Sequence, residues 1–239
     1  MNHIQNHETE VIDLGLIEYQ EGLDYQTRLF TDILAVKTAN RTFPESEQLV
    51  TKNYIIFCEH PHVFTLGKSG DEKNLLVKRE DLSSINASFH PINRGGDITY
   101  HGPGQIVVYP IIDMENFFTD IHLYMRMLEE SVIQTLKEFS IESGRIQGLT
   151  GVWIDVNGKN PRKICALGVK TSRWVTLHGL AFNVNTDLSY FSHIVPCGID
   201  GKEVTSMEKE LDNPQDIEKI KKVLEKNLFT MFGMTSQKS

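Results

Sequence analysis

The sequence has few cysteines and no long hydrophobic run. Its three cysteines, Cys58, Cys165 and Cys197, are an odd number in 239 residues and lie far apart, which excludes a disulfide framework. We therefore expect free thiols in a reducing, cytoplasmic setting. No apolar stretch approaches the roughly 20 residues that cross a bilayer, and residues 1–10 lack the apolar core of a signal peptide. These absences predict a cytoplasmic protein that does not enter a membrane.

The sequence also lacks an excess of positive charge. It has 24 lysines and arginines against 32 aspartates and glutamates, for a net charge of -8. A nucleic-acid-binding surface needs a cluster of basic residues, so we expect no nucleic-acid partner. Metal-site patterns such as C-x-x-C and H-E-x-x-H are absent too, and His60-Pro61-His62 does not replace them. We assign no metal and no cofactor.

No repeat, low-complexity run or linker divides the chain. We therefore expect one domain over residues 11–234, preceded by a flexible tail over residues 1–10. Short apolar runs predict strands, and apolar residues three and four apart predict helices. The strands occur in groups between the helices, which favours an α+β fold, a mixed β-sheet with helices packed against it. We expect strands at 11–16, 54–58, 63–66, 106–112, 151–156, 164–169 and 174–184, and helices at 19–39, at 120–139 and from 213 onward.

The segment from Arg94 to Gln105 (RGGDITYHGPGQ) is rich in glycine, with four in twelve residues. Glycine loses more conformational entropy on ordering than any other residue, so this density needs a reason. Either the segment forms two tight turns around a short strand, or its backbone approaches a ligand closely. In the second case Arg94, Tyr100 and His101 would project around that ligand. A phosphate-binding loop fits poorly, because the G-x-x-x-x-G-K-[ST] pattern is absent.

One cysteine lies in a different context from the other two. Cys58 and Cys165 lie inside apolar runs, and we expect them in the core. Cys197 lies between a proline and a glycine after a polar loop, so it is the candidate nucleophile. Its thiol would need a nearby cation to become a thiolate at neutral pH, because an ordinary thiol has a pKa of about 8.5. The candidates for that cation are His60, His62, His101, His178, His193, Lys163 and Lys170.

Several sequence blocks, taken in order, resemble one known family, the octanoyltransferases of lipoate biosynthesis. Together they cover most of the chain, and their ordered combination is far more specific than any one of them. The blocks are Glu59-His60-Pro61 with VFTLG at 63–67, RGGDITYHGPGQ at 94–105, Lys163-Ile164 with Leu167-Gly168, His178-Gly179 with Ala181 and Asn183-Val184, and Pro196-Cys197-Gly198-Ile199.

The resemblance implies an acyltransferase, a lipoyl(octanoyl) transferase, that moves an octanoyl group from octanoyl-acyl carrier protein to a lysine of a lipoyl domain. This is the first step of protein lipoylation, and the implied acceptors are the lipoyl domains of 2-oxoacid dehydrogenases and the H protein of glycine cleavage. The implied nucleophile is Cys197, which would carry the acyl group as a thioester. Lys163 is implied as the partner that lowers the pKa of this thiol. The implied fold is that of the catalytic domain of biotin protein ligases and lipoate ligases.

The resemblance also implies a set of substrate-binding residues. These are Arg94, Gly95, Gly96, Asp97, Ile98, Thr99, Tyr100 and His101, then Ala166, Leu167 and Gly168, and finally Gly179, Leu180 and Ala181. Three other functions remain open at this point. An ATP-dependent lipoate or biotin-type ligase would need no cysteine, and a lipoyl-protein amidotransferase would take its acyl group from another lipoyl protein. A non-catalytic binding module would use neither Cys197 nor Lys163.

Overall fold

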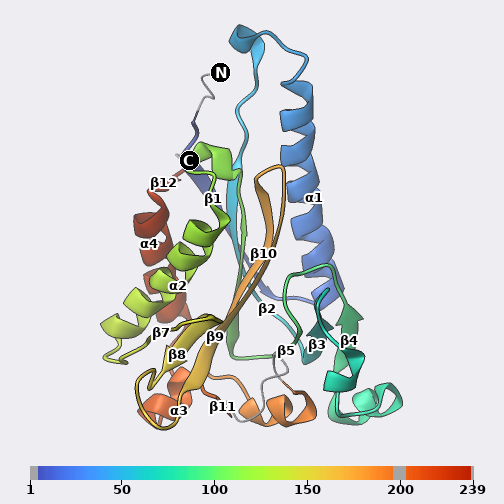
Figure 1. Cartoon of the computed structure of the whole chain (residues 1–239), viewed down its shortest axis with the longest axis vertical. Helices are drawn as coiled ribbons and strands as arrows, with labels where there is room; N and C mark the ends of the chain where they lie inside the picture. The colour runs from blue at the N-terminus through green and yellow to red at the C-terminus, as the bar shows by residue number, and fades with distance from the viewer. Residues whose placement is uncertain (1–4, 196–202, 238–239) are drawn as a thin grey trace.

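The computed structural model describes residues 5–195 and 203–237. Within these residues a mixed β-sheet runs along the long axis of the molecule, with helices on both of its faces (Figure 1). The strand order is β12-β1-β2-β6-β10-β9-β8-β7, and β11 pairs with β9. The strands are β1 (Glu8–Leu16), β2 (Asn53–Glu59), β6 (Gln105–Ile111), β7 (Gly144–Ile146), β8 (Leu149–Ile154), β9 (Arg162–Ser172), β10 (Val175–Asn183), β11 (Glu203–Val204) and β12 (Thr235–Ser236). The architecture confirms the predicted α+β class.

The central strands of this sheet are buried on both faces. Every residue of β6 and β10 is buried, and so is every residue of β2 except the last. Continuous apolar runs of this kind are typical of strands that helices cover on both sides. The strand β1 runs parallel to β2, whereas β2, β6, β10, β9 and β8 pair antiparallel in that order.

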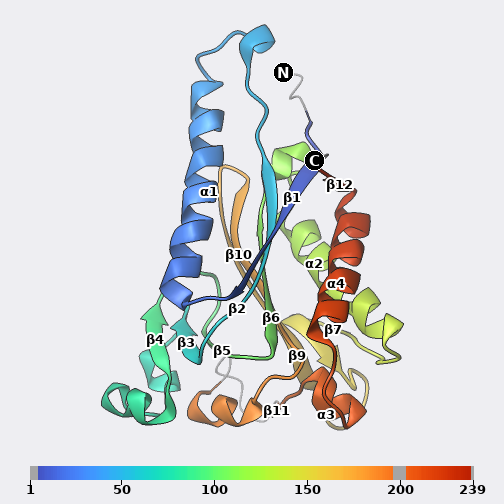
Figure 2. The same ribbon diagram turned by 180° about the vertical axis from the view of Figure 1, so that it is seen from behind.

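Three longer helices form the outer layers. The helix α1 (Tyr19–Ala39) covers one face of the sheet, and α2 (Ile121–Glu138) and α4 (Ile217–Phe232) cover the other (Figures 1 and 2). Each face has its own apolar core. Leu128 and Leu224 are fully buried on the α2 and α4 side, and Ile33 is almost fully buried on the α1 side. Burial of each such side chain contributes about 1.5–3 kcal/mol.

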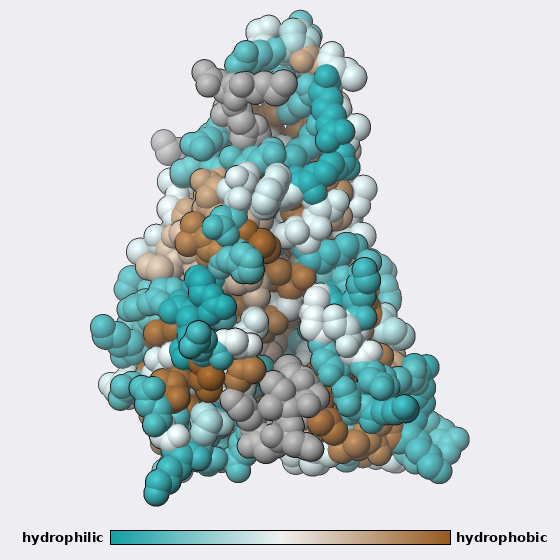
Figure 3. All heavy atoms as spheres, in the orientation of Figure 1, coloured by the Kyte–Doolittle hydropathy of each residue, from teal (hydrophilic) through white to brown (hydrophobic). Residues whose placement is uncertain are grey.

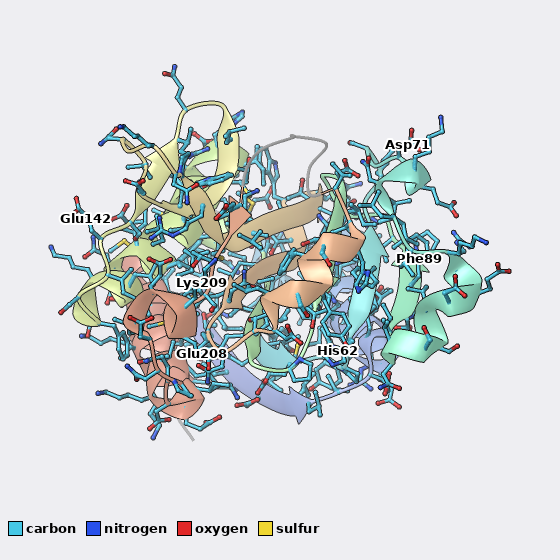
Figure 4. The ribbon with its side chains drawn as sticks, turned by 90° about the horizontal axis from the view of Figure 1, so that it is seen from below. His62, Asp71, Phe89, Glu142, Glu208 and Lys209 are labelled. Atoms are coloured by element: carbon cyan, nitrogen blue, oxygen red, sulfur yellow. The ribbon has the colours of Figure 1, made fainter. Side chains whose placement is uncertain are left out.

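A second, three-stranded sheet packs beside the N-terminal end of α1 (Figures 1 and 2). Its strands are β4 (Ser88–Pro91), β3 (Val63–Leu66) and β5 (Ile98–His101), in the order β4-β3-β5. Phe64 and Tyr100 are fully buried in its own apolar cluster. Viewed from below, Phe89 of this sheet and the nearby Asp71 lie across the molecule from Glu208 and Lys209 (Figure 4), which belong to the short helix α3 (Met207–Leu211).

The first strand differs from the sequence prediction. Residues 8–10 were expected in the flexible tail, but β1 begins at Glu8, and Thr9 is buried. The reason is that β1 has partners on both sides: Thr9 pairs with Asn53 of β2 and with Ser236 of β12. These pairings satisfy the backbone of a segment whose side chains are polar. The helix predicted at residues 19–39 has the bounds that the sequence pattern gave.

Among the described residues, no helix has the length and the apolar character that a bilayer crossing requires.

Candidate functional site

A cavity of about 640 Å³ lies against the centre of the large sheet. Residues of β6, β8, β9 and β10 line it, together with the loop from Arg94 to Asp97, the first turns of α2 and Tyr19 at the start of α1. In Figure 3 hydrophobic residues gather along the middle of the face shown in Figure 1, between the side of α2 and the side of the small sheet. The cavity brings together most of the residues that the sequence singled out for a substrate site.

The glycine-rich loop at the cavity is held by backbone contacts. A Cβ atom on Gly67 would lie 2.2 Å from the Gly96 carbonyl oxygen, so this approach requires glycine. The Lys68 N–H donates to the Arg94 carbonyl at 2.9 Å, and the Gly95 N–H donates to the Val169 carbonyl of β9 at 3.2 Å. The loop therefore bridges the small sheet and the large one, and its close approach to a ligand stays a prediction.

The Arg94 side chain braces this loop from within. Its guanidinium donates to the Gly95 carbonyl and to the Asp97 carbonyl, each at 2.8 Å. The Asp97 carboxylate accepts from the Asn74 side chain at 2.7 Å. A Cβ atom on Gly168 of β9 would lie 2.5 Å from the Arg94 Nη1 atom. Arg94 and Asp97 thus shape the cavity wall through their contacts with the chain itself.

Tyr100 lies elsewhere than the sequence analysis placed it. The expectation was that its side chain would project around a ligand, but it is fully buried in the cluster of the small sheet and does not line the cavity. Its ring stacks on Tyr190 at 5.0 Å, and its hydroxyl lies 2.7 Å from His62 Nδ1. The side chains of β5 alternate between faces, so His101 reaches the cavity while Tyr100 points away from it.

A local break in strand pairing turns His178 into the cavity. Pro110 of β6 has no N–H to give to β10, and the ladder between these strands extends only as far as Val108 and Leu180. His178 has a φ of +64°, which a non-glycine residue rarely adopts. Its N–H donates to the Gln26 side chain of α1 at 2.9 Å, a contact that holds this conformation.

Three buried histidines at or beside the cavity, His60, His101 and His178, are neutral at physiological pH. Burial, reinforced by the neighbouring His60, lowers the pKa of His101 to about 3. Burial and the nearby Arg94 guanidinium lower the pKa of His178 to about 3. His60 Nδ1 donates to the Ile17 carbonyl at 2.8 Å, so its Nε2 accepts the Tyr109 hydroxyl at 2.8 Å. None of these three imidazoles can supply the cation that a thiolate needs.

Lys163, at the start of β9, lines the cavity from the side of β8. Its Nζ atom lies 4.8 Å from the centre of the Trp153 ring, a cation–π contact. Its stem packs against Gly151, where a Cβ atom would lie 3.2 Å from Lys163 Cε and 2.8 Å from the Cys165 carbonyl oxygen. Gly151 has a φ of +126°. A side chain at this position would displace the lysine.

A buried carboxylate fixes the backbone beneath Lys163. Glu129 of α2 is fully buried, and one of its oxygens accepts the Gly151 N–H at 2.9 Å. Its other oxygen accepts from Arg126 at 2.6 Å and from Arg145 at 3.0 Å. Two arginines offset the cost of burying this charge. Glu129 could not be identified from the sequence, because nothing in the α2 pattern distinguishes it from the other acidic residues of that helix.

Two of the three cysteines are buried as expected. Cys58 and Cys165 are free thiols, and burial raises the pKa of each far above its ordinary value. Neither can act as a thiolate at neutral pH. Cys197, the candidate nucleophile, lies outside the described residues, so its predicted proximity to Lys163 stays a prediction.

Most of the expected substrate-site residues line the cavity. These are Arg94, Gly95, Gly96, Asp97, Ile98, Thr99, His101, Ala166, Leu167, Gly168, Gly179, Leu180 and Ala181. Tyr19, Val107 and Tyr109, which no sequence motif indicated, line it as well. The spacing of two between Val107 and Tyr109 could have placed both on one face of β6, but not over a cavity. Within the described residues, no group of three histidines, cysteines or acids could hold a metal ion.

Comparison with known proteins defines the class first. The lipoyl protein ligase A/B catalytic domain matches residues 19–229. Among solved structures, a bi-partite lipoate protein ligase from Thermoplasma acidophilum aligns with a TM-score of 0.67 at 15% identity, over 98% of this chain and 87% of that one. A biotin protein ligase from Aquifex aeolicus aligns with a TM-score of 0.51 at 13% identity, over 95% and 71%. The fold is therefore that of lipoate and biotin protein ligase catalytic domains.

Relatives with similar sequences identify the family within this fold class. An octanoyltransferase from Cytophaga hutchinsonii is 55% identical over 235 residues, which are 98% of this chain and 96% of that protein. An octanoyltransferase from Flavobacterium johnsoniae is 55% identical over 228 residues, which are 95% and 97%. The chain belongs to the octanoyltransferases, a family of acyltransferases, which confirms the resemblance seen in the sequence.

Proposed function

We propose that this protein transfers an octanoyl group from octanoyl-acyl carrier protein to a lysine of lipoyl domains, through a thioester on Cys197. The acceptors are the lipoyl domains of 2-oxoacid dehydrogenases and the glycine cleavage H protein. The observation that carries the proposal is a cavity with small apolar residues along the strands and Lys163 at one side, in a chain 55% identical to octanoyltransferases over almost its whole length. Neutral imidazoles and phenols beside small apolar residues suit a hydrocarbon chain better than a charged ligand.

The proposed reaction has two acyl transfers. The Cys197 thiolate attacks the carbonyl carbon of the carrier-protein thioester, and the phosphopantetheine thiolate leaves and takes a proton from the Lys163 ammonium group, which becomes an amine. One thioester replaces another, so this step is close to thermoneutral. The amine of the acceptor lysine then attacks the Cys197 thioester, an amide forms, and the Cys197 thiolate is released. Lys163 stabilises the thiolate as an ammonium group, and as an amine it accepts the proton of the attacking lysine.

The site geometry supports Lys163 over the other candidate cations. Burial lowers the pKa of His60, His62, His101 and His178, so these imidazoles are neutral where a cation is needed. Lys163 lines the cavity, and Trp153 and Gly151 fix the path of its side chain. Lys170 does not line the cavity.

The first test is incubation with octanoyl-acyl carrier protein, followed by intact mass measurement. We expect one octanoyl adduct that hydroxylamine removes, present in the wild type and in Cys165→Ala but absent in Cys197→Ala. Cys165→Ala is the matched control, because this thiol is buried and has a raised pKa. Lys163→Ala should slow alkylation of Cys197 at neutral pH. Alkylation at the wild-type rate would contradict the role given to Lys163.

The same fold also carries ATP-dependent ligation in other proteins, and one solved relative is a lipoate-protein ligase A bound with ATP, aligned with a TM-score of 0.66 at 16% identity. A ligase would acylate a lipoyl domain from free octanoate and ATP, and it would tolerate Cys197→Ser. An amidotransferase would use an octanoylated lipoyl protein as the donor instead of the carrier protein. Parallel assays with the three donors separate these reactions, and we expect turnover with the carrier-protein thioester alone.

A further inference from the structure

A path of small residues runs across neighbouring strands of the large sheet and ends at Val107, and Ala166, Ala181 and Val107 on it line the cavity. Ala181 of β10 pairs with Ala166 of β9 on one side and with Val107 of β6 on the other. The pairing of Val152 with Cys165 brings Gly151 of β8 beside Ala166, one residue further along the ladder. The path therefore runs across four neighbouring strands from Gly151 through two alanines to Val107, the first branched side chain on it.

The two ends of this path differ in chemistry. At the Gly151 end the stem of Lys163 packs over the backbone, so the reacting carbonyl of the proposed transfer belongs there. At the other end Val107 and Tyr109 lie on the same face of β6, and Tyr19 of α1 joins them at the cavity. These three side chains, which we call the end wall, are each less than 5% exposed: Val107 1%, Tyr19 3% and Tyr109 4%.

The end wall is held rigidly by its neighbours. The Tyr109 hydroxyl donates to His60 Nε2 at 2.8 Å, and His60 in turn donates to the Ile17 carbonyl just before α1. The Tyr19 ring packs edge-on against His60 at 5.2 Å and stacks on His101 at 6.1 Å. A wall whose members are fixed by both α1 and β6 can stop a chain at a defined depth, because its side chains have no room to swing aside.

The length of the path matches one acyl chain. Four neighbouring strands are separated by three gaps, so the backbones of Gly151 and Val107 lie about 14 Å apart. An extended octanoyl group measures about 9 Å from its carbonyl carbon to its methyl carbon, with bonds of about 1.5 Å at near-tetrahedral angles. The Lys163 stem at one end and the Val107 side chain at the other occupy the remaining length. Two further methylenes would add about 2.5 Å and meet the end wall.

We propose that the end wall of Val107, Tyr109 and Tyr19 sets the acyl-chain length that this site accepts. The inference rests on the proposed octanoyl transfer and adds the residues that select the substrate. Val107 is the member that faces the end of the small-residue path, so its size decides how far the terminal methyl group can reach. One methylene more or less in a closed apolar pocket changes kcat/KM by about ten-fold or more.

The test compares Val107 with its neighbour Val108. Val108 is fully buried on the same strand but faces the opposite core and does not line the cavity. For each variant, kcat/KM is measured with hexanoyl, octanoyl and decanoyl carrier protein. We expect Val107→Ala to raise the ratio of decanoyl to octanoyl transfer about ten-fold, and Val107→Ile to lower the ratio of octanoyl to hexanoyl transfer by a similar factor. Val108→Ala removes the same two methyl groups and should leave both ratios at their wild-type values.

Calorimetric binding of octanoate and decanoate to the same variants separates this inference from the proposed function. If the wild type does not transfer octanoyl groups but Val107→Ala still shifts binding toward decanoate, the proposed transfer function is refuted. The selection of chain length by the end wall is then still supported. If Val107→Ala does not fold, Val107→Ile provides the test, because it leaves no cavity in the core. Wild-type ratios in every folded Val107 variant, for transfer and for binding, would overturn the end wall.

Discussion

At Gly151 the backbone conformation and the missing side chain determine where the Lys163 side chain can lie. Its φ of +126° lies in a region that other residues rarely adopt, and its N–H is bound by the buried Glu129 carboxylate. The missing side chain leaves the space through which the Lys163 stem passes. One glycine thus couples a buried charge of α2 to the direction of a lysine on β9, and neither contact is visible in the sequence.

Replacing this glycine should cost both stability and reactivity. We expect Gly151→Ala to lower the free energy of unfolding by about 2–3 kcal/mol, because the new Cβ atom would meet a backbone carbonyl in a strained conformation. We also expect slower Cys197 alkylation at neutral pH, since the lysine stem must move. Urea denaturation and thiol alkylation measure the two effects.

Gly15→Ala is the control for Gly151→Ala. Gly15 has a φ of +60° and open space where a Cβ atom would lie. The substitution there should lower the free energy of unfolding by about 1 kcal/mol, because only the left-handed backbone conformation is unfavourable. It lies far from Lys163 in the fold, on β1, and alkylation should not change. Equal stability losses in the two variants would show that the carbonyl contact at Gly151 relaxes without cost.

At the level of elements, the pairing between β6 and β10 is interrupted beside the cavity. Because Pro110 cannot donate to β10, Thr176 takes over the pairing with its side chain: its hydroxyl accepts the Ile112 N–H at 3.0 Å and donates to the Pro110 carbonyl at 2.7 Å. The strands stay joined on one side of the break, while His178 and Gly179 do not pair with β6 and line the cavity.

We expect two threonines that pair across the β9–β10 hairpin to contribute differently to the stability of the fold. Thr176→Val keeps the shape of the side chain but leaves the buried Ile112 N–H without its acceptor, so we expect a loss of about 2 kcal/mol in the free energy of unfolding. Thr171, its exposed cross-strand partner, has no such role, and Thr171→Val should change stability by less than about 0.5 kcal/mol. Similar effects of both substitutions in urea denaturation would show that the hydroxyl does not maintain the junction.

Elements with a strong periodic pattern could be predicted from the sequence, and those that depend on distant partners could not. The helix at residues 19–39 and the strands of the central sheet were predicted to within a few residues, because their apolar spacing is local information. The strands β4, β7, β11 and β12 were missed. They have two to four residues each and exist only because a neighbour pairs with them.

The candidate functional site shows the same difference between features that local sequence determines and features that distant contacts determine. The motif residues from Arg94 to Thr99 and from Gly179 to Ala181 line the cavity, and their role in substrate binding stays a prediction. Tyr100 was placed wrongly, since the face of a strand to which a residue points depends on register rather than on membership of a motif. The conformation of His178 depends on Gln26, which is 152 residues away in the chain, and no local pattern reports such a contact.

At the level of the whole molecule, the buried histidines predict how stability depends on pH. The pKa of His101 and of His178 falls from an ordinary 6.5 to about 3 in the folded protein. Between these values the unfolded chain binds protons that the folded chain does not, so stability rises with pH across this window. The contribution is complete above about pH 6.5 and is lost progressively as the pH falls toward 3.

Urea denaturation across this range should show the loss beginning well above the titration of the carboxyl groups. Glu130 and Glu210 also have a lowered pKa and act in the same direction, but only below their ordinary value of 4.5. Between pH 6.5 and 5 the slope therefore belongs to the histidines, at most about 1.4 kcal/mol per pH unit for each. His178→Asn should flatten the slope over the whole window from about pH 6.5 to about pH 3 and leave the slope below pH 3 unchanged. A wild-type stability that stays constant down to pH 5 would mean that both imidazoles can be protonated within the folded cavity, and the lining would then carry charge where a hydrocarbon chain is proposed to lie.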